Sequence, residues 1–412
     1  PHILKARYDL PTAPGPLVWV YPFDEYHDWA KNHADRLPEV YYGDWFIRQA
    51  INTGLPLNTV ISTSSFQEVV WEKPGLFDES ILITIAPEEG SALEITLMEF
   101  VKMGGRLIVY GPVDHSSQEF MDFINLSNLD PLEGEMQVVS TVEGNLVKGK
   151  ALDQINHRSL FSGGGFRSHM NDSEDKYSQR LIHVEQSGHS RDMAWSRAHP
   201  DWKGGKVLYF RGTNSSSFTG GRLLTPDDPE EYLIVPGLLR KLLTVFGMDL
   251  KVEKLNVSIK DPILTINRSD NAFIFSGYNP NSTVKQQFRF EQGAPLLLGL
   301  ETILENGHST YTMPTAWHRE CRAFVEQKSG MISFKELHSG QKGIKKRYQV
   351  SGLNNGTLRF YPQDSVKKDD LNVYLDAGYP WKTGQIPFKE ISDGKVKYFE
   401  VSGVSGTIVF AW

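Results

Sequence analysis

Residues 80–112 decide the fold: they read SILITIAPEEG, then SALEITLMEFVKMGG, then RLIVYGP. The first block is a short apolar run rich in β-branched residues, which predicts a buried strand. Apolar residues in the second block recur with helical spacing, Ser91 is a suitable N-cap with Glu94 completing a capping box, and Gly104-Gly105 ends the helix. The third block predicts a second buried strand, so the stretch predicts a strand–helix–strand unit.

The rest of the first 254 residues repeats this alternation of strands and helices. Parallel strands joined by crossover helices are expected from such an order. The amphipathic segment Tyr232–Phe246 predicts the last helix of this domain. We therefore predict a doubly wound, flavodoxin-like or amidotransferase-like α/β domain over residues 1–254, with further strands at Leu17–Tyr21, Thr59–Thr63 and Lys206–Arg211.

The pattern of apolar and polar residues changes near residue 255. Short segments in which apolar and polar residues alternate follow one another. Asn, Gly, Pro and Asp separate them, a pattern typical of antiparallel β-sandwiches. Residues 255–412 are therefore predicted to form one or more β-sandwich domains. The expected strands are Asp261–Asn267, Ala272–Tyr278, Thr283–Phe290, Glu320–Glu326, Met331–Leu337, Lys346–Val350, Gly356–Tyr361, Asn372–Leu375, Val396–Val401 and Gly406–Trp412.

Composition narrows the class of protein. The chain has 412 residues, 40% of them hydrophobic and 23% charged, as in soluble globular proteins. A net charge of -7 argues against a general nucleic-acid-binding surface. No apolar run approaches the roughly 20 residues that span a bilayer. The single cysteine is compatible with the cytosol and with bacterial export, so the compartment stays open. No motif calls for a cofactor.

Glu88 and Glu89 are the first candidate site residues. They follow the strand at residues 81–86, in the turn where an α/β hydrolytic domain places a nucleophile, and that turn holds no Ser or Cys. Ligands favour the carboxyl edge of an open α/β sheet, where a carboxylate can act as general acid or base. The alternative is a solvated acidic pair at a helix start, which the helix dipole favours.

Histidines gather between residues 157 and 199. Imidazole is a common zinc ligand, so a metal site is conceivable here. None of these histidines has the close His-x-x-x-His spacing of a known zinc motif, and no cysteine lies near. Surface histidines are the alternative, and we predict no metal. The residues are His157, His169, His183, His189 and His199.

Cys321 has His318 and Glu320 close by in sequence, which superficially resembles an activated nucleophile. On an alternating strand, however, Cys321 shares a face with Ala323 and Val325. A small buried core residue is the expected role.

Tyr379 and Trp381 lie in a segment that reads as an exposed loop. An aromatic ring in such a loop can stack on the apolar C–H face of a sugar. Packing in a core or at a domain interface is the alternative. These two residues are the candidates for carbohydrate binding.

Residues 17–246 resemble the class I glutamine-amidotransferase-like accessory domain of β-galactosidases in glycoside hydrolase family 42. The resemblance rests on LVWVY at residues 17–21, TIAP at 84–87, FVKMGGRLIVYGP at 100–112, GKVLYFRG at 205–212 and LLRKLL at 238–243. In that family the domain follows a catalytic barrel, supports trimer assembly, precedes a small β domain and lacks the amidotransferase nucleophile. The resemblance implies no catalytic residue in this chain.

The leading hypothesis is the C-terminal, non-catalytic region of a multidomain glycoside hydrolase. The chain begins at Pro1 with neither an initiator Met nor a signal peptide, and we therefore expect it to be a segment of a longer protein. Expected partners are carbohydrate, a catalytic domain upstream or in another chain, and further copies of the chain in a homo-oligomer. The alternatives are a free-standing carbohydrate-binding or assembly module and a self-contained hydrolase that uses Glu88, Glu89 or the histidine-rich segment.

Overall fold

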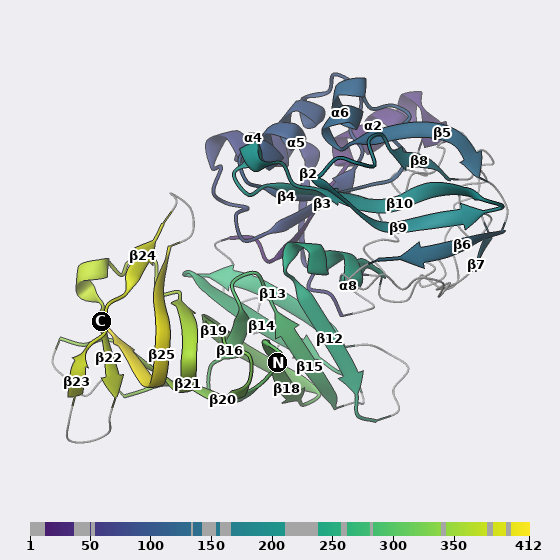
Figure 1. Cartoon of the computed structure of the whole chain (residues 1–412). Coiled ribbons are helices and arrows are strands. Elements are labelled where there is room, and N and C mark those ends of the chain that lie inside the picture. Colours follow the sequence, from purple (N-terminus) through teal and green to yellow (C-terminus); the bar gives the residue numbers. More distant parts are fainter. Residues whose placement is uncertain are drawn as a thin grey trace. The chain divides into compact units, whose positions relative to one another are not determined.

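The computed structural model describes residues 13–36, 50, 54–132, 135–141, 154–156, 166–210, 238–256, 262–280, 283–338, 343–376, 382–392 and 397–412. The chain divides into two compact units (Figure 1). The α/β unit comprises residues 16–51 and 57–246, and the β unit comprises residues 1–15, 52–56 and 247–412. The division falls at residue 246 rather than 254, because strand β12 (Asp249–Lys254) pairs with β15 (Val284–Arg289) of the β unit.

Five parallel strands form one side of the described sheet of the α/β unit. Their order is β2-β1-β3-β4-β11, and every neighbouring pair among them is parallel. This is the 2-1-3-4-5 order of flavodoxin-like sheets, so the predicted α/β class is confirmed. The strands are β1 (Leu17–Tyr21), β2 (Thr59–Ser62), β3 (Ile81–Ile85), β4 (Arg106–Tyr110) and β11 (Lys206–Phe210).

Antiparallel strands extend this sheet beyond β11. The order continues β10-β9-β6-β7, while β5 and β8 pair as a separate two-stranded ladder. β6, β7, β9 and β10 therefore continue the sheet. The strands are β5 (Leu126–Leu132), β6 (Glu135–Ser140), β7 (Gln154–Asn156), β8 (Phe166–Met170), β9 (Ser178–Gln186) and β10 (His189–Arg197).

Serine residues cap the helices that follow β2, β3 and β4. The side chains of Ser62, Ser91 and Ser117 accept hydrogen bonds from the first turns of α4, α5 and α6. Of the predicted helix Tyr232–Phe246, the structure describes residues 238–246. The helices are α2 (Phe23–Asn32), η1 (Ala34–Arg36), α4 (Thr63–Glu72), α5 (Ala92–Lys102), α6 (Gln118–Phe123), η4 (Pro200–Trp202), α8 (Leu238–Leu243) and η6 (Thr244–Phe246). None of these described helices is long and apolar enough to cross a membrane.

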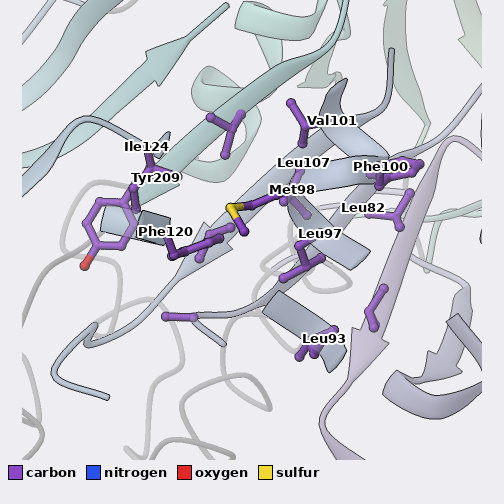
Figure 2. Packing of buried hydrophobic residues seen from close by; sticks show 14 of the residues in the cluster. Leu82, Leu93, Leu97, Met98, Phe100, Val101, Leu107, Phe120, Ile124 and Tyr209 are labelled. Carbon is purple, nitrogen blue, oxygen red and sulfur yellow. The ribbon is translucent and has the colours of Figure 1, made fainter. Parts of the chain in front are cut away.

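The core of the α/β unit lies between α5 and the parallel strands (Figure 2). Leu93, Leu97 and Val101 of α5 are buried in one cluster with Leu82 of β3 and Leu107 of β4. Their spacing is the one that predicted an apolar helical face in the sequence. The helix and both strands of residues 80–112 are therefore held together by apolar burial.

The described strands of the β unit belong to one connected sheet of 14 strands. The predicted all-β class is confirmed, whereas a sandwich of two separate sheets is not. The strands, all described, are β12, β13 (Ile263–Ser269), β14 (Ala272–Tyr278), β15, β16 (Ala294–Leu297), β17 (Glu301–Glu305), β18 (His308–Met313), β19 (Ala316–Glu326), β20 (Gly330–Glu336), β21 (Arg347–Phe360), β22 (Asn372–Asp376), β23 (Lys382–Gln385), β24 (Lys389–Ile391) and β25 (Tyr398–Ala411).

Two long strands explain how one sheet encloses a core. β21 and β25 each span 14 residues, and their pairing shifts register at three places. Such bulges bend strands and increase their twist. Side chains of β16, β19, β20, β21, β22 and β25 consequently share one hydrophobic cluster. Alternation in the sequence marks the two faces of each strand but does not say whether the strands form one sheet or two.

Candidate functional site at the carboxyl edge of the parallel sheet

The turns after β1, β2 and β3 bring polar side chains together. Asp24 and Glu25 begin α2 after β1, and Thr63 begins α4 after β2. The Thr63 hydroxyl oxygen lies 2.7 Å from Glu25 Oε2 and 3.2 Å from Asp24 Oδ2, and the Ser64 backbone N–H donates to Asp24 Oδ2 at 3.1 Å. The carboxyl ends of neighbouring parallel strands lie at one edge of a sheet, which explains this convergence.

Glu88, after β3, is held by two donors. Trp29 Nε1 donates to Glu88 Oε1 at 3.1 Å, and Arg36 Nη1 makes a short ion pair with the same oxygen. The Arg36 guanidinium carbon lies 4.0 Å from the centroid of the Trp29 ring, a cation–π distance. The Arg36 side chain is 10% exposed and that of Glu88 is 42% exposed. The Glu88 carboxylate is therefore a partner in a fixed ion pair.

The acidic groups of this edge differ in proton affinity. Burial is the main cause that raises the pKa of Glu25 above its ordinary value, and the nearby charges of Asp24 and Glu88 add to the rise while the Thr63 hydroxyl opposes it. The hydrogen bond from Ser64 is the main cause that lowers the pKa of Asp24. Two carboxyl groups with opposite tendencies lie side by side, an arrangement found in acid–base pairs.

Glu89 lies outside this cluster. Its side chain is exposed, and its backbone N–H donates to the His115 carbonyl at 2.7 Å. Glu94 is the buried acid of the turn: its carboxylate accepts from the backbone N–H groups of Gly90 at 2.8 Å and Ser117 at 3.1 Å. The predicted capping box is thus half correct, because Ser91 caps α5 while Glu94 binds Gly90 and Ser117 instead of Ser91.

The backbone of the turn lacks the strain of a nucleophile elbow. Within Pro87–Gly90 only Gly90 has a left-handed φ, at 70°. In hydrolases of this kind the nucleophile occupies a sharp, strained strand-to-helix turn. The structure therefore shows neither the side chain nor the backbone conformation of such a nucleophile.

The histidines predicted as metal candidates are dispersed. His183 pairs with Glu185 at 2.9 Å, and His199 lies 3.5 Å from Asp201. His189 is an exposed residue at the start of β10, and His157 lies outside the described residues. Among the residues that the structure describes, no three His, Cys, Asp or Glu side chains gather closely enough to hold a metal ion.

His169 belongs to a buried ionic network. Its Nδ1 lies 3.1 Å from Asp192 Oδ2, and Arg180 Nε lies 2.7 Å from Asp192 Oδ1. The fully buried Asp192 also accepts from the Met170 backbone N–H at 2.8 Å. Burial is the main cause that lowers the pKa of His169, and the Arg180 and Arg191 charges add to this while Asp192 opposes it. The network ties β8, β9 and β10 together.

This network predicts a pH dependence of stability. Because the pKa of His169 in the folded chain lies below its ordinary value of 6.5, the unfolded chain binds more protons as the pH falls past that value. The His169 contribution to stability is therefore present above pH 6.5 and is lost on acidification. Urea unfolding at pH 7.5 and 5.5 should show a smaller loss for His169→Gln than for the wild type. Equal losses would contradict the prediction.

Of the remaining candidates from the sequence, Cys321 is described by the structure, whereas Tyr379 and Trp381 are not. Cys321 is fully buried, and burial raises the pKa of its thiol, which donates to the Ala323 carbonyl at 3.4 Å. A buried protonated thiol is a core residue, as predicted, rather than a nucleophile. Tyr379 and Trp381 lie outside the described residues, so sugar stacking on them stays a prediction.

Sequence reasoning missed Glu25, Trp29, Arg36 and Thr63. Arg36 and Trp29 reach Glu88 across 52 and 59 residues of sequence. The sequence signal that could have indicated this site is the acidic pair Asp24 and Glu25 after the first strand. The segment after that strand lies at the same edge of a parallel sheet as Glu88. No local pattern marked Arg36.

Comparisons with known proteins give only distant structural similarity. No family model matches the chain, and no curated protein matches it. Solved structures similar to it include a putative ThuA-like protein from Bacteroides uniformis, at 12% identity and a TM-score of 0.31, covering 56% of this chain and 93% of that one. The N-terminal domain of mmIFT52 is similar at 13% identity and a TM-score of 0.27, covering 56% and 97%. Scores this low carry no argument about family or activity.

Proposed function

We propose that this chain is the non-catalytic region of a multidomain glycoside hydrolase, which serves assembly and helps to form a sugar-binding cleft. The observation that supports a non-catalytic role is the pairing of the Glu88 carboxylate. At the position where a nucleophile would stand, its carboxylate is paired with Arg36 and Trp29 on an unstrained turn. A group that is committed to an ion pair stabilises structure rather than attacking a substrate.

The carbohydrate part of the proposal rests on the resemblance of residues 17–246 to the family 42 accessory domain. Its partners would be a catalytic domain, upstream or in another chain, and a carbohydrate. The test is to assay the 412-residue chain for both glycan binding and turnover of aryl glycosides. Binding without turnover supports the proposal. Turnover by the chain alone overturns its non-catalytic part, and the absence of binding to any glycan overturns its carbohydrate part.

Assembly is supported by the exposed apolar residues at one edge of the α/β unit. β2 is the terminal strand of the described sheet, and its Val60 is 58% exposed. Trp71 of α4, the next element along the chain, is 57% exposed. Open sheet edges and exposed apolar groups favour association with another chain. Sedimentation velocity should therefore show an oligomer that the charged substitution Val60→Lys dissociates, and a monomeric wild-type chain would contradict this.

The arrangement of Glu25 and Glu88 favours one alternative, a self-contained hydrolase. Burial raises the pKa of Glu25, and a carboxyl group of raised pKa close to a second carboxyl group is suited to general acid–base catalysis. If the alternative holds, Glu25→Gln and Glu88→Gln should each reduce kcat at least about 100-fold, which is the usual contribution of a general acid or base. The exposed Glu89→Gln is the matched control and should leave kcat unchanged. Turnover that survives both substitutions would exclude this alternative.

A further inference from the structure

The β unit contains a cavity of about 450 Å³ on the β14–β19 part of its sheet. This volume falls within the roughly 300–1,000 Å³ typical of small-molecule sites. The lining combines acidic, basic, hydroxyl and apolar side chains. The lining residues are Ser269, Asp270, Ile274, Leu298, His318, Arg319, Glu320 and Arg322.

Alternation along β19 places three of the polar lining groups on one face of the strand. His318, Glu320 and Arg322 alternate along β19, so their side chains project to the same side. In the β14–β19 pairing, Ile274 lies opposite Glu320. The Leu298 backbone N–H donates to the Glu320 carbonyl at 2.8 Å, which brings the end of β16 to the cavity. The wall therefore combines residues of β13, β14 and β19 with the residue that follows β16.

The β13–β14 turn supplies Asp270 in a fixed conformation. Asp270 and Asn271 have φ values of 47° and 63°, as a two-residue hairpin turn of the I′ type requires. The Asn271 side-chain amide donates to the carbonyls of Pro362 at 3.0 Å and Lys397 at 2.7 Å. The Asp364 backbone N–H donates to Asp270 Oδ1 at 3.1 Å. The turn is thus held before any ligand arrives.

Arg322 orients the acidic groups from beneath. Its side chain is 7% exposed, Nε makes a short ion pair with Glu320 Oε1, and Nη2 lies 3.6 Å from Asp270 Oδ2. Nη1 donates to the Asp270 carbonyl at 2.9 Å. Glu320 Oε2 makes no hydrogen bond with the described residues and remains an acceptor. A buried guanidinium that holds two partly exposed carboxylates is a preorganised arrangement.

The charges of the lining indicate the class of ligand. The two carboxylates, Asp270 and Glu320, are balanced by the two guanidinium groups, Arg319 and Arg322. A balanced lining does not favour an anion or a cation. Carboxylates accept hydrogen bonds from hydroxyl groups, and Ile274 and Leu298 offer apolar surface to C–H groups. These are the complementary groups for a neutral ring that carries several hydroxyls.

We propose that this cavity binds an uncharged polyhydroxylated ligand, a sugar ring. The inference rests on the carbohydrate part of the proposed function and deepens it by assigning a site. That site is separate from the loop of Tyr379 and Trp381 that the sequence suggested.

The test uses calorimetric titration of the full chain with D-galactose, D-glucose and lactose. Glucose 6-phosphate and glucosamine serve as charged analogues of the same ring. The neutral sugars should bind, and neither charged analogue should bind more than 10-fold tighter than glucose. Leu298→Trp, which fills the cavity, should weaken binding at least 10-fold. Met331→Trp adds the same ring at a position that is 60% exposed outside the cavity and should change nothing.

The outcomes separate this inference from the proposed function. Sugar binding that survives Leu298→Trp but is lost in Trp381→Ala overturns the cavity site and leaves the carbohydrate proposal standing. Failure of every neutral sugar and every larger glycan to bind overturns both. Preferential binding of a charged analogue overturns the ligand class. If Leu298→Trp does not retain the wild-type melting temperature, the near-isosteric variant Glu320→Gln replaces it as the test. That variant should also bind the neutral sugars at least 10-fold more weakly.

Discussion

Replacing Trp195 by alanine is expected to lower the free energy of unfolding of the α/β unit by about 4 kcal/mol, within the range for removing a buried aromatic side chain. Trp195, on β10, is 1% exposed and belongs to the main hydrophobic cluster. Its ring centroid lies 4.8 Å from that of Tyr209, and its indole Nε1 donates to the Ile124 carbonyl at 2.7 Å. The substitution leaves a cavity and removes the donor of a buried carbonyl.

Two variants separate the effects at Trp195. Trp195→Phe keeps most of the apolar volume but loses the donor, so its destabilisation should fall well below that of the alanine variant. Ile95→Ala is the surface control, because Ile95 is 54% exposed, and should cost less than about 0.5 kcal/mol. Urea unfolding followed by circular dichroism measures all three. A loss below about 2 kcal/mol for Trp195→Ala would show that the site collapses around the deletion.

Gly205→Ala is the second large prediction, with an expected destabilisation of about 3 kcal/mol from overpacking. A Cβ at this position would overlap the Val101 carbonyl oxygen at the end of α5 and would lie 2.9 Å from the Trp202 carbonyl oxygen. Both obstacles are backbone atoms, so rotation of a side chain cannot relieve the clash. The next residue, Lys206, donates to the Gly105 carbonyl at 3.0 Å, and this bond positions β11 beside β4.

The neighbouring glycine provides the control. Gly204 has a φ of 88°, and a Cβ there would meet no atom within 4 Å. Asn tolerates left-handed backbone better than most residues, so Gly204→Asn should cost about 1 kcal/mol. Thermal unfolding of the two variants under identical conditions tests the difference. Equal destabilisation would mean that the close approach to α5 does not set a special requirement for glycine at position 205.

The strand and helix boundaries near residues 80–112 were predictable because their signals are local. The expected strand at residues 81–86 is observed as β3 (Ile81–Ile85), and Ser91 caps α5 as predicted. Such signals depend on the spacing of apolar residues and on hydrogen bonds within one turn. The candidate site depends on distant residues, since Arg36 and Thr63 reach Glu88 and Glu25 only after the parallel strands align.

The amino-acid sequence by itself determined the two classes of structure, the helix caps and the absence of a nucleophile after β3, because each is recorded in residue types or in short-range periodicity. Only the tertiary structure decided that the described strands of the β unit form one connected sheet, that Glu88 pairs with Arg36, and that Gly205 lies too close to α5 for a side chain. The physical reason is the same in all three cases. Strand pairing, ion pairing and close backbone approach join residues that are far apart in the chain, and no local pattern records which distant groups will meet.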